Sequence, residues 1–325
     1  MQIRTIITAL TAAAVMTVAA TASADRSDWP RSITVGTASQ GGTYFIYGSG
    51  WADMVAEELD IRAGGEVTGG PVQNATLVET GDHQFGMVTM GPAYAAWTGN
   101  SELAPGLEHK SIRAVFPMYQ TTFHVITRAR DGFNSLNDLA GKRVGVGPAG
   151  GTADMYFPQF FDLLGIDVQI RNGGASDLAG QLQDGLIDAF AFAAGVPISA
   201  FSQLEAEIDV NIFSVTEAQQ RQILDAFPEL SPASITPEQY GSLGGEVQAV
   251  SIWNFAITHK DIPESLVYGV TKTVMENHER MMRIHRAAWE TVPENVQYNS
   301  FLPFHPGAVR WFEENGYHIP DDLRG

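Results

Sequence analysis

The sequence contains no cysteine, which excludes disulfide bonds, a lipid anchor on an amino-terminal cysteine and a cysteine nucleophile. Basic residues are also scarce, with 19 Lys and Arg against 37 Asp and Glu and a formal net charge of −18. Such an acidic surface repels nucleic acids and anionic lipid headgroups, so neither is an expected partner. The acidic residues are spread along the chain, which indicates a solvated surface and not an acidic tail.

Most signatures of catalysis and of nucleotide binding are missing as well. The chain has no G-x-S-x-G elbow, no H-E-x-x-H motif and no G-x-x-x-x-G-K-[ST] loop, and its first glycine-rich turn lacks the G-x-G-x-x-G spacing. Carboxylate pairs are frequent in so acidic a chain, but the sequence places no two of them at a productive separation. We therefore expect a protein that is not an enzyme and that needs no cofactor and no metal ion.

The longest apolar run lies at the start of the chain, from Ile6 to Ala20, and it is shorter than the roughly 20 residues that a membrane span needs. Arg4 precedes this run, and Ala22-Ser23-Ala24 follows it. The pattern predicts a secretory signal peptide, residues 1–24, that is cleaved after Ala24. An uncleaved anchor is the alternative. With cleavage, the mature protein would be periplasmic or secreted, without direct membrane insertion.

The remaining chain is long enough for two hydrophobic cores, since 44% of the residues are hydrophobic. Short β-rich runs alternate with segments of helical period, which predicts parallel α/β sheets. One order of elements occurs twice, beginning at VGTASQGGTYF and again at VGVGPAGGT. The spacing from glycine pair to following glycine is the same in both, Gly70 to Gly81 and Gly174 to Gly185. The repetition predicts two similar α/β lobes.

Each half of the chain has a Gly-Gly-Thr turn before a predicted helix, ending at Thr43 and at Thr152. Ligands of open parallel sheets bind beyond the carboxyl ends of the strands, where such turns lie. The first N–H groups of a helix lack internal partners and carry partial positive charge, so two facing turns would favour an anion such as a carboxylate. The competing interpretation is that the glycines only form tight turns and the threonines only cap helices.

The sequence resembles the solute receptors of TAXI-type TRAP transporters, from about Ile33 to the final helices. The resemblance rests on ITVGTASQGGTYF, VQNATLVETGDHQFGMV, KRVGVGPAGGTADM and LQDGLIDAFAFAAGVP. It implies the two-lobed type II periplasmic binding protein fold, with an open, mostly parallel sheet flanked by helices in each lobe and two hinge strands between them. It also implies a monomer that delivers a small organic acid, such as a dicarboxylate, an acidic amino acid or a keto acid, to the membrane subunits of a TRAP transporter.

The resemblance further implies a ligand site at the facing strand ends of the lobes, with Thr43 as the main carboxylate donor. The sequence departs from the family pattern at two places, because Gly150-Gly151-Thr152 lacks a serine and Val88-Thr89-Met90 replaces a more usual Gln-Ser-Asp. Other interpretations stay open, namely packing for Tyr44, helix capping for Gln73 and Asn74, strand termination for Pro197 and a core position for His124. The implied site residues are Ser39, Gly42, Thr43, Tyr44, Gln73, Asn74, Thr89, His124, Gly151, Thr152, Gly195, Val196 and Pro197, with Tyr94 as a weaker candidate.

Two long β-rich runs, residues 114–127 and 247–258, predict the strands that cross between the lobes. Lobe I is then residues 31–119 plus 252–325, and lobe II is residues 120–251. Residues 203–245 contain three prolines that interrupt the pattern and predict helices and loops on the outside of lobe II.

Residues 263–290 predict one long helix or two, on which His278 and His285 could share a face. Solvated histidines explain that pair better than a metal site, since no further metal ligand can be assigned to the face.

No arginine lies inside the two glycine-rich turns, VGTASQGGTYF and VGVGPAGGT, and Arg171 is the nearest candidate for binding a carboxylate. We therefore expect backbone amides and hydroxyls to hold the ligand. The alternative function is a receptor of the same fold that presents its ligand to a periplasmic sensor domain, and a secreted enzyme is less favoured.

Overall fold

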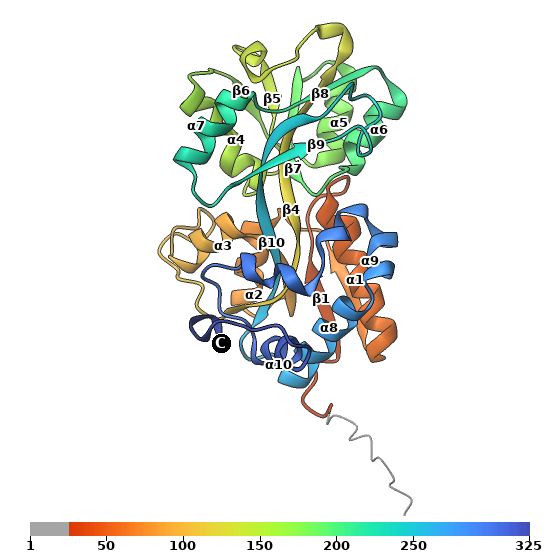
Figure 1. The fold of residues 1–325 in the computed structure, drawn as a ribbon, viewed down its shortest axis with the longest axis vertical. Coiled ribbons are helices and arrows are strands. Elements are labelled where there is room, and N and C mark those ends of the chain that lie inside the picture. The colour runs from red at the N-terminus through yellow and green to blue at the C-terminus, as the bar shows by residue number, and fades with distance from the viewer. Residues whose placement is uncertain (1–25) are drawn as a thin grey trace, which may run out of the picture.

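The computed structural model describes residues 26–325, and the predicted signal peptide lies outside the described residues. Two lobes are stacked along the longest axis of the molecule and are joined by two long strands, β4 (Ile112–Arg128) and β10 (Val247–His259) (Figure 1). These two strands pair antiparallel with each other, and their register shifts between Trp253 and Phe255. Both predicted crossing strands are thereby confirmed. The predicted lobe boundaries, between residues 119 and 120 and between residues 251 and 252, both fall within these strands, and the exact division stays a prediction.

The first lobe is a sheet with helices packed around it (Figure 1). Its strands follow the order β2-β1-β3-β10-β4, and the pairs β1–β2 and β1–β3 are parallel. The carboxyl-terminal helices return to this lobe, as expected. Its elements are β1 (Ser32–Gly36), α1 (Thr43–Leu59), β2 (Arg62–Glu66), α2 (Pro71–Glu79), β3 (Phe85–Thr89), α3 (Met90–Trp97), α8 (Glu264–Glu276), α9 (His278–Ile284) and α10 (Pro306–Glu314).

The second lobe continues the same sheet through β4 in the order β7-β5-β6, where β5 pairs parallel with both of its neighbours. The alternation predicted for each half is therefore confirmed. The elements of this lobe are β5 (Arg143–Gly145), α4 (Thr152–Leu164), β6 (Gln169–Arg171), α5 (Ala175–Asp184), β7 (Ala189–Ala194), α6 (Ser199–Glu207), β8 (Val210–Phe213), α7 (Glu217–Ala226) and β9 (Ser231–Ile235).

Residues 203–245 differ from the prediction, because they include two strands besides helices. Strand β8 pairs with β4, and β9 pairs with β10. Strand β9 contains Pro232, and no second partner is recorded for it among the described strands. Proline lacks an N–H and is tolerated at a sheet edge. Pro232, which argued against a strand in the sequence, is therefore compatible with β9.

The predicted helical segment 263–290 divides at Asn277, which ends α8 and precedes α9. Its last residues, Arg286–Glu290, form a 3-10 helix instead of continuing α9. This short helix carries Ala287, Ala288 and Glu290 into buried positions beside β4.

Core packing in the first lobe follows the helical spacing of α1. Tyr47, Trp51, Met54 and Val55 lie on one face of this helix and are fully buried. Trp51 meets Phe85 and Phe116 edge to face, with ring centroids 6.0 and 5.7 Å apart. In a chain without cysteine, such apolar and aromatic burial supplies the main stabilisation.

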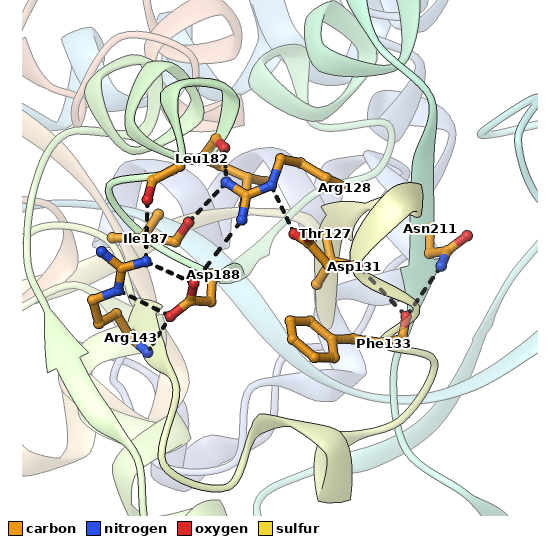
Figure 2. Close-up of polar contacts among 10 residues, drawn as sticks. Thr127, Arg128, Asp131, Phe133, Arg143, Leu182, Ile187, Asp188 and Asn211 are labelled. Atoms are coloured by element: carbon orange, nitrogen blue, oxygen red, sulfur yellow. Dashed lines mark hydrogen bonds and ion pairs between the residues drawn. The ribbon is translucent and has the colours of Figure 1, made fainter.

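A polar network fixes the end of β4 in the second lobe (Figure 2). Buried Arg128 donates from Nε to Asp131 at 2.7 Å, and its Nη1 donates to the carbonyls of Leu182 and Ile187. Arg143 grips Asp188 with two nitrogens, at 2.9 and 2.7 Å. Because Arg128 Nη2 lies 3.9 Å from the same carboxylate, the network ties β4 to β5 and to the turn before β7.

Candidate functional site

A small cavity of about 40 Å³ lies where the two lobes face each other. Its walls come from loops and helix ends of both lobes, and no charged side chain is among the described residues that line it. The lining residues are Ala38, Ser39, Gly42, Thr43, Tyr44, Gly69, Gly70 and Pro71 from the first lobe and Pro148, Gly151, Thr152, Phe192, Ala193 and Ala194 from the second.

The amino termini of α1 and α4 meet at this cavity. Each helix begins at a threonine that follows a glycine N-cap, Gly42 or Gly151, and neither N-cap offers a side chain to the first turn. The first N–H groups of both helices therefore have no partner inside their helix and bring partial positive charge to the cavity. Asp154 lies in the first turn of α4 and accepts a hydrogen bond from Gly150 N–H at 3.0 Å, which offsets part of that charge.

Three threonine hydroxyls make two hydrogen bonds across the cleft. Thr43 Oγ1 donates to the carbonyl of Gly195 at 2.5 Å. The hydroxyls of Thr89 and Thr152 lie 2.8 Å apart, and either oxygen can be the donor. These contacts hold the lobes closed, and they occupy the Thr43 hydroxyl that the sequence assigned to a carboxylate.

The loop between β1 and α1 accepts three further hydrogen bonds from the second lobe. Ser39 Oγ accepts a hydrogen bond from Ala175 N–H at 3.2 Å, and the Gln40 carbonyl accepts one from Ser176 N–H at 3.2 Å. The Gly41 carbonyl accepts from Ala200 N–H at 3.0 Å. These donors are N–H groups in the first turns of α5 and α6, which have no acceptor within their own helices. The first lobe therefore supplies hydrogen-bond acceptors to helix amino termini of the second. We call residues 39–41 the capping loop.

Of the residues predicted for the site, six line the cavity, and the others do not. Tyr44 lines it while its hydroxyl donates to Asn254 Oδ1 at 2.6 Å, and burial raises the pKa of Tyr44 well above its usual range. Gln73 accepts a hydrogen bond from Gly69 N–H, and buried Asn74 donates to the carbonyls of Thr37 and Met87. Both amides thus hold the loop before α2. The six lining residues are Ser39, Gly42, Thr43, Tyr44, Gly151 and Thr152.

His124 is a core histidine in this structure, away from the cavity. Its Nδ1–H donates to the Thr122 carbonyl at 3.0 Å, and Nε2 accepts from Tyr240 Oη at 2.9 Å. The Thr122 carbonyl can only accept, so the proton of the neutral ring lies on Nδ1, and Tyr240 Oη also accepts from Ile198 N–H at 2.7 Å. Burial lowers the pKa of His124 from 6.5 to about 4, so the ring is neutral at pH 7.

The remaining predicted residues lie around the cleft and not in the cavity. Gly195 takes part through its carbonyl, and Val196 and Pro197 line two other pockets. Tyr94 is exposed in a separate groove between α3 and α4. Arg171 is exposed and contacts the Ile170 carbonyl and Gln169, so it does not reach the cavity.

Sequence reasoning missed several cleft residues. Phe192 on β7 lies against Gly42 and Gly147, where a Cβ on Gly147 would be 2.6 Å from its ring. The alternation of side chains along the predicted strand was the available signal for Phe192. His285 was expected to be solvated, but it is buried and donates from Nε2 to the Pro197 carbonyl at 3.0 Å. That contact joins segments far apart in the chain and has no local signal.

The second glycine-rich turn, Gly145 to Gly150, does carry a G-x-G-x-x-G spacing. Its last glycine approaches Val72 of the first lobe, and the adjoining cavity encloses only about 40 Å³. Asp154, in the first turn of the helix that follows, accepts the hydrogen bond from Gly150 N–H and places a negative charge at this helix end, which disfavours binding of a dinucleotide pyrophosphate.

Among residues 26–325, no helix is long and apolar enough to cross a membrane. The same part of the chain holds no group of three or more His, Cys, Asp or Glu residues that could bind a metal ion. His278 and His285 make separate contacts, with the carbonyls of Ala288 and Pro197.

Solved structures that are similar to this chain include three binding proteins. MatC from Rhodopseudomonas palustris, solved with bound malate, is 16% identical with a TM-score of 0.58, over 88% of this chain and 97% of MatC. The periplasmic binding protein BugD is 15% identical with a TM-score of 0.56, over 88% of this chain and 97% of its own. An ABC transporter substrate-binding protein from Streptococcus pneumoniae with bound histidine is 13% identical with a TM-score of 0.52, over 81% of this chain and 94% of that one.

These likenesses show the fold, which is the two-lobed type II periplasmic binding protein fold predicted from the sequence. A sequence model of the NMT1-like family matches residues 35–316, which includes both lobes and both crossing strands. The chain therefore belongs to the NMT1-like family.

Proposed function

We propose that this protein is a periplasmic solute receptor that binds a small organic acid between its lobes. The observation that carries the proposal is the meeting of two uncapped helix amino termini, those of α1 and α4, at one cavity with the hydroxyls of Thr43 and Thr152. A site of this kind binds by closing, and no residue in it is set up to transfer a proton or to attack a substrate.

The donors at the cavity suit a carboxylate. Backbone N–H groups at helix ends and hydroxyls can donate to both carboxylate oxygens, and a hydrogen bond to a charged acceptor is stronger than one between neutral groups. The net charge of −18 does not oppose this binding strongly, because charges beyond a Debye length of about 8 Å are screened at physiological salt. The apolar surfaces of Phe192 and Pro71 favour an uncharged remainder of the ligand.

The size of the cavity requires the lobes to move. About 40 Å³ has room for a few water molecules but not for a dicarboxylate. The hydrogen bonds between Thr89 and Thr152 and between Thr43 and Gly195 are the contacts that a ligand would separate and replace. Rotation about β4 and β10 would open the cleft, since these strands are the long connections between the lobes (Figure 1).

The finer assignment is delivery of the acid to TRAP transporter membrane subunits as a TAXI-type receptor. It rests on the resemblance of the four quoted motifs. A periplasmic location follows from the predicted signal peptide, and monomeric behaviour is expected for such a receptor.

A ligand screen tests the binding site. The purified mature protein is heated with a panel of dicarboxylates, acidic amino acids, keto acids, neutral sugars and metal salts, and the melting temperature is measured. An organic acid should raise the melting temperature and be recovered unchanged. A shift with a neutral sugar and none with any acid would overturn the carboxylate proposal. Uptake of the labelled acid into vesicles that carry candidate TRAP subunits, with and without the receptor, tests delivery separately.

A further inference from the structure

A second pocket, of about 210 Å³, lies beside the crossing strands and shares no lining residue with the cavity between the lobes. Its walls come from β4, β9, the segment after β7 and the 3-10 helix Arg286–Glu290. We call it the hinge pocket. Its lining residues are Gln120, Thr122, Val196, Pro232, Ala233, Ser234, Gln239, Ala287, Trp289 and Glu290.

The hinge pocket contains a carboxylate without a positive partner. Glu290 is only 7% exposed, and its two oxygens accept hydrogen bonds from Gln120 N–H and from Gln120 Nε2, both at 2.8 Å. Both donors are neutral, and no Lys, Arg or His within residues 26–325 forms an ion pair with Glu290. Burial raises the pKa of the Glu290 carboxyl, which is the mark of a charge that lacks compensation. A cation in the pocket would supply that compensation.

An aromatic side chain stands next to this carboxylate. Trp289 lines the same pocket, yet it is 60% exposed, which is unusual for so large an apolar group. The face of an indole ring attracts cations, and quaternary ammonium groups are recognised by such faces. Thr122, Ser234 and Gln239 add polar groups to the walls. A carboxylate beside an accessible indole is the combination that holds an organic cation.

A metal ion fits this pocket less well than an organic cation. No group of three or more His, Cys, Asp or Glu residues that could hold a metal occurs in the described part of the chain, so Glu290 stands alone as a charged ligand. A metal ion needs several oxygen or nitrogen ligands at close range, whereas an alkylammonium ion needs one counter-ion and apolar contact.

We propose that the hinge pocket binds a small alkylammonium ion, with Glu290 as its counter-ion and Trp289 against its apolar groups. This site is separate from the proposed acid site, so an acid and an ammonium ion can be bound at the same time.

Isothermal titration calorimetry of the mature protein with choline chloride, at fixed ionic strength, tests the proposal. The comparison compound is the neutral alcohol in which a tert-butyl group replaces the trimethylammonium group of choline. Choline should bind at least about tenfold more tightly than this isostere, since only choline can pair with Glu290. Equal affinities, or no binding of choline, would overturn the proposal.

Variants of the pocket residues test where choline binds on the protein. Trp289→Ala should weaken choline binding roughly five- to thirtyfold, whereas Trp289→Phe retains a ring and most of the affinity. Trp289 is exposed, so these variants should fold with unchanged melting temperature. Glu290→Gln should abolish the preference over the isostere. Glu294→Gln removes the same charge from an exposed side chain that accepts a hydrogen bond from Tyr317 Oη, and it should have no effect on choline binding.

Three results would contradict the assignment. If Trp289→Ala binds choline as tightly as the unchanged protein, choline does not contact the indole ring. If Glu294→Gln weakens binding as much as Glu290→Gln, choline responds only to overall charge. If Thr152→Val removes choline binding while Trp289→Ala does not, choline binds between the lobes. A failed screen with organic acids leaves these comparisons unaffected, so the two proposals fail independently.

Discussion

The hydroxyl oxygens of Thr89, in the first lobe, and Thr152, in the second lobe, lie 2.8 Å apart across the cleft. Thr89 is the last residue of β3, and Thr152 is the first residue of α4. Both side chains are buried, so this contact is protected from water when the lobes are closed. A carboxylate placed here would exchange one neutral hydrogen bond for two charge-assisted ones.

Replacing the hydroxyl at this contact should weaken acid binding. Thr152→Val keeps the branched shape and removes the donor, so the affinity for the acid found in the screen should fall about ten- to hundredfold. Calorimetry measures the affinity, and Thr80→Val, an exposed position at the end of α2, is the matched control. Unchanged affinity in Thr152→Val would remove this hydroxyl from the site.

The capping loop should control how closely the lobes approach. Gly41 has φ +85°, and a Cβ there would lie 2.6 Å from Ser176 Oγ and 2.9 Å from Ser176 N. Gly41→Ala should therefore increase the radius of gyration in small-angle X-ray scattering and weaken acid binding.

Gly81→Ala is the control that distinguishes the steric clash at Gly41 from the backbone strain of a positive φ. Gly81 has φ +79°, but a Cβ there would meet nothing within 4 Å. Both substitutions should cost roughly 1 kcal/mol of unfolding free energy because of the positive φ. Only Gly41→Ala should change the radius of gyration, and an equal change in both variants would contradict the role of the capping loop.

Stability should fall as the solution becomes acidic. Burial lowers the pKa values of His124 and His305 from 6.5 to about 4 and also lowers the pKa of His285. The unfolded chain binds protons at these residues before the folded protein does, so the free energy of unfolding decreases between pH 6.5 and 4. Each histidine contributes up to about 1.4 kcal/mol per pH unit.

Urea denaturation across this pH range measures the effect. His124→Gln should be less stable at pH 7, because the bond with Tyr240 changes, but its stability should depend less steeply on pH. The exposed His318→Gln serves as the control. An unchanged slope in His124→Gln would mean that His124 does not resist protonation in the folded protein.

The network in Figure 2 should stabilise the second lobe. Asp188→Asn weakens the two-nitrogen grip of Arg143 and should lower the free energy of unfolding by about 1–3 kcal/mol at pH 7. Hydrogen bonding from Arg143 lowers the pKa of Asp188, so its stabilisation is present at neutral pH and is lost as pH falls through that lowered pKa. Glu217 forms an exposed ion pair with Arg221 and provides the control. Chemical denaturation should show that Glu217→Gln lowers the free energy of unfolding by less than about 0.5 kcal/mol. Equal losses in both variants would contradict a special role for the network.

Local patterns were enough to predict much of the fold. The long β-rich runs predicted β4 and β10, and the repeated order of elements predicted the alternating strands and helices of the two lobes. Strand β9 was missed because proline argues against a strand unless its position at a sheet edge is known, and that position depends on pairing with β10. The turn from α9 to the 3-10 helix was missed because the segment keeps a helical apolar spacing through it.

The sequence by itself determined the two-lobed fold, the repeated order of elements and the two Gly-Gly-Thr turns, because these depend on spacing and on conformational preferences of neighbouring residues. Tertiary structure decided which partner each polar group has. The Thr43 hydroxyl donates to the Gly195 carbonyl, and His124 accepts from Tyr240 in the core. His285 donates to the Pro197 carbonyl, and Glu290 accepts from Gln120, a neutral partner. Each of these outcomes joins residues far apart in the chain, and a hydrogen bond forms only where folding brings donor and acceptor within about 3 Å.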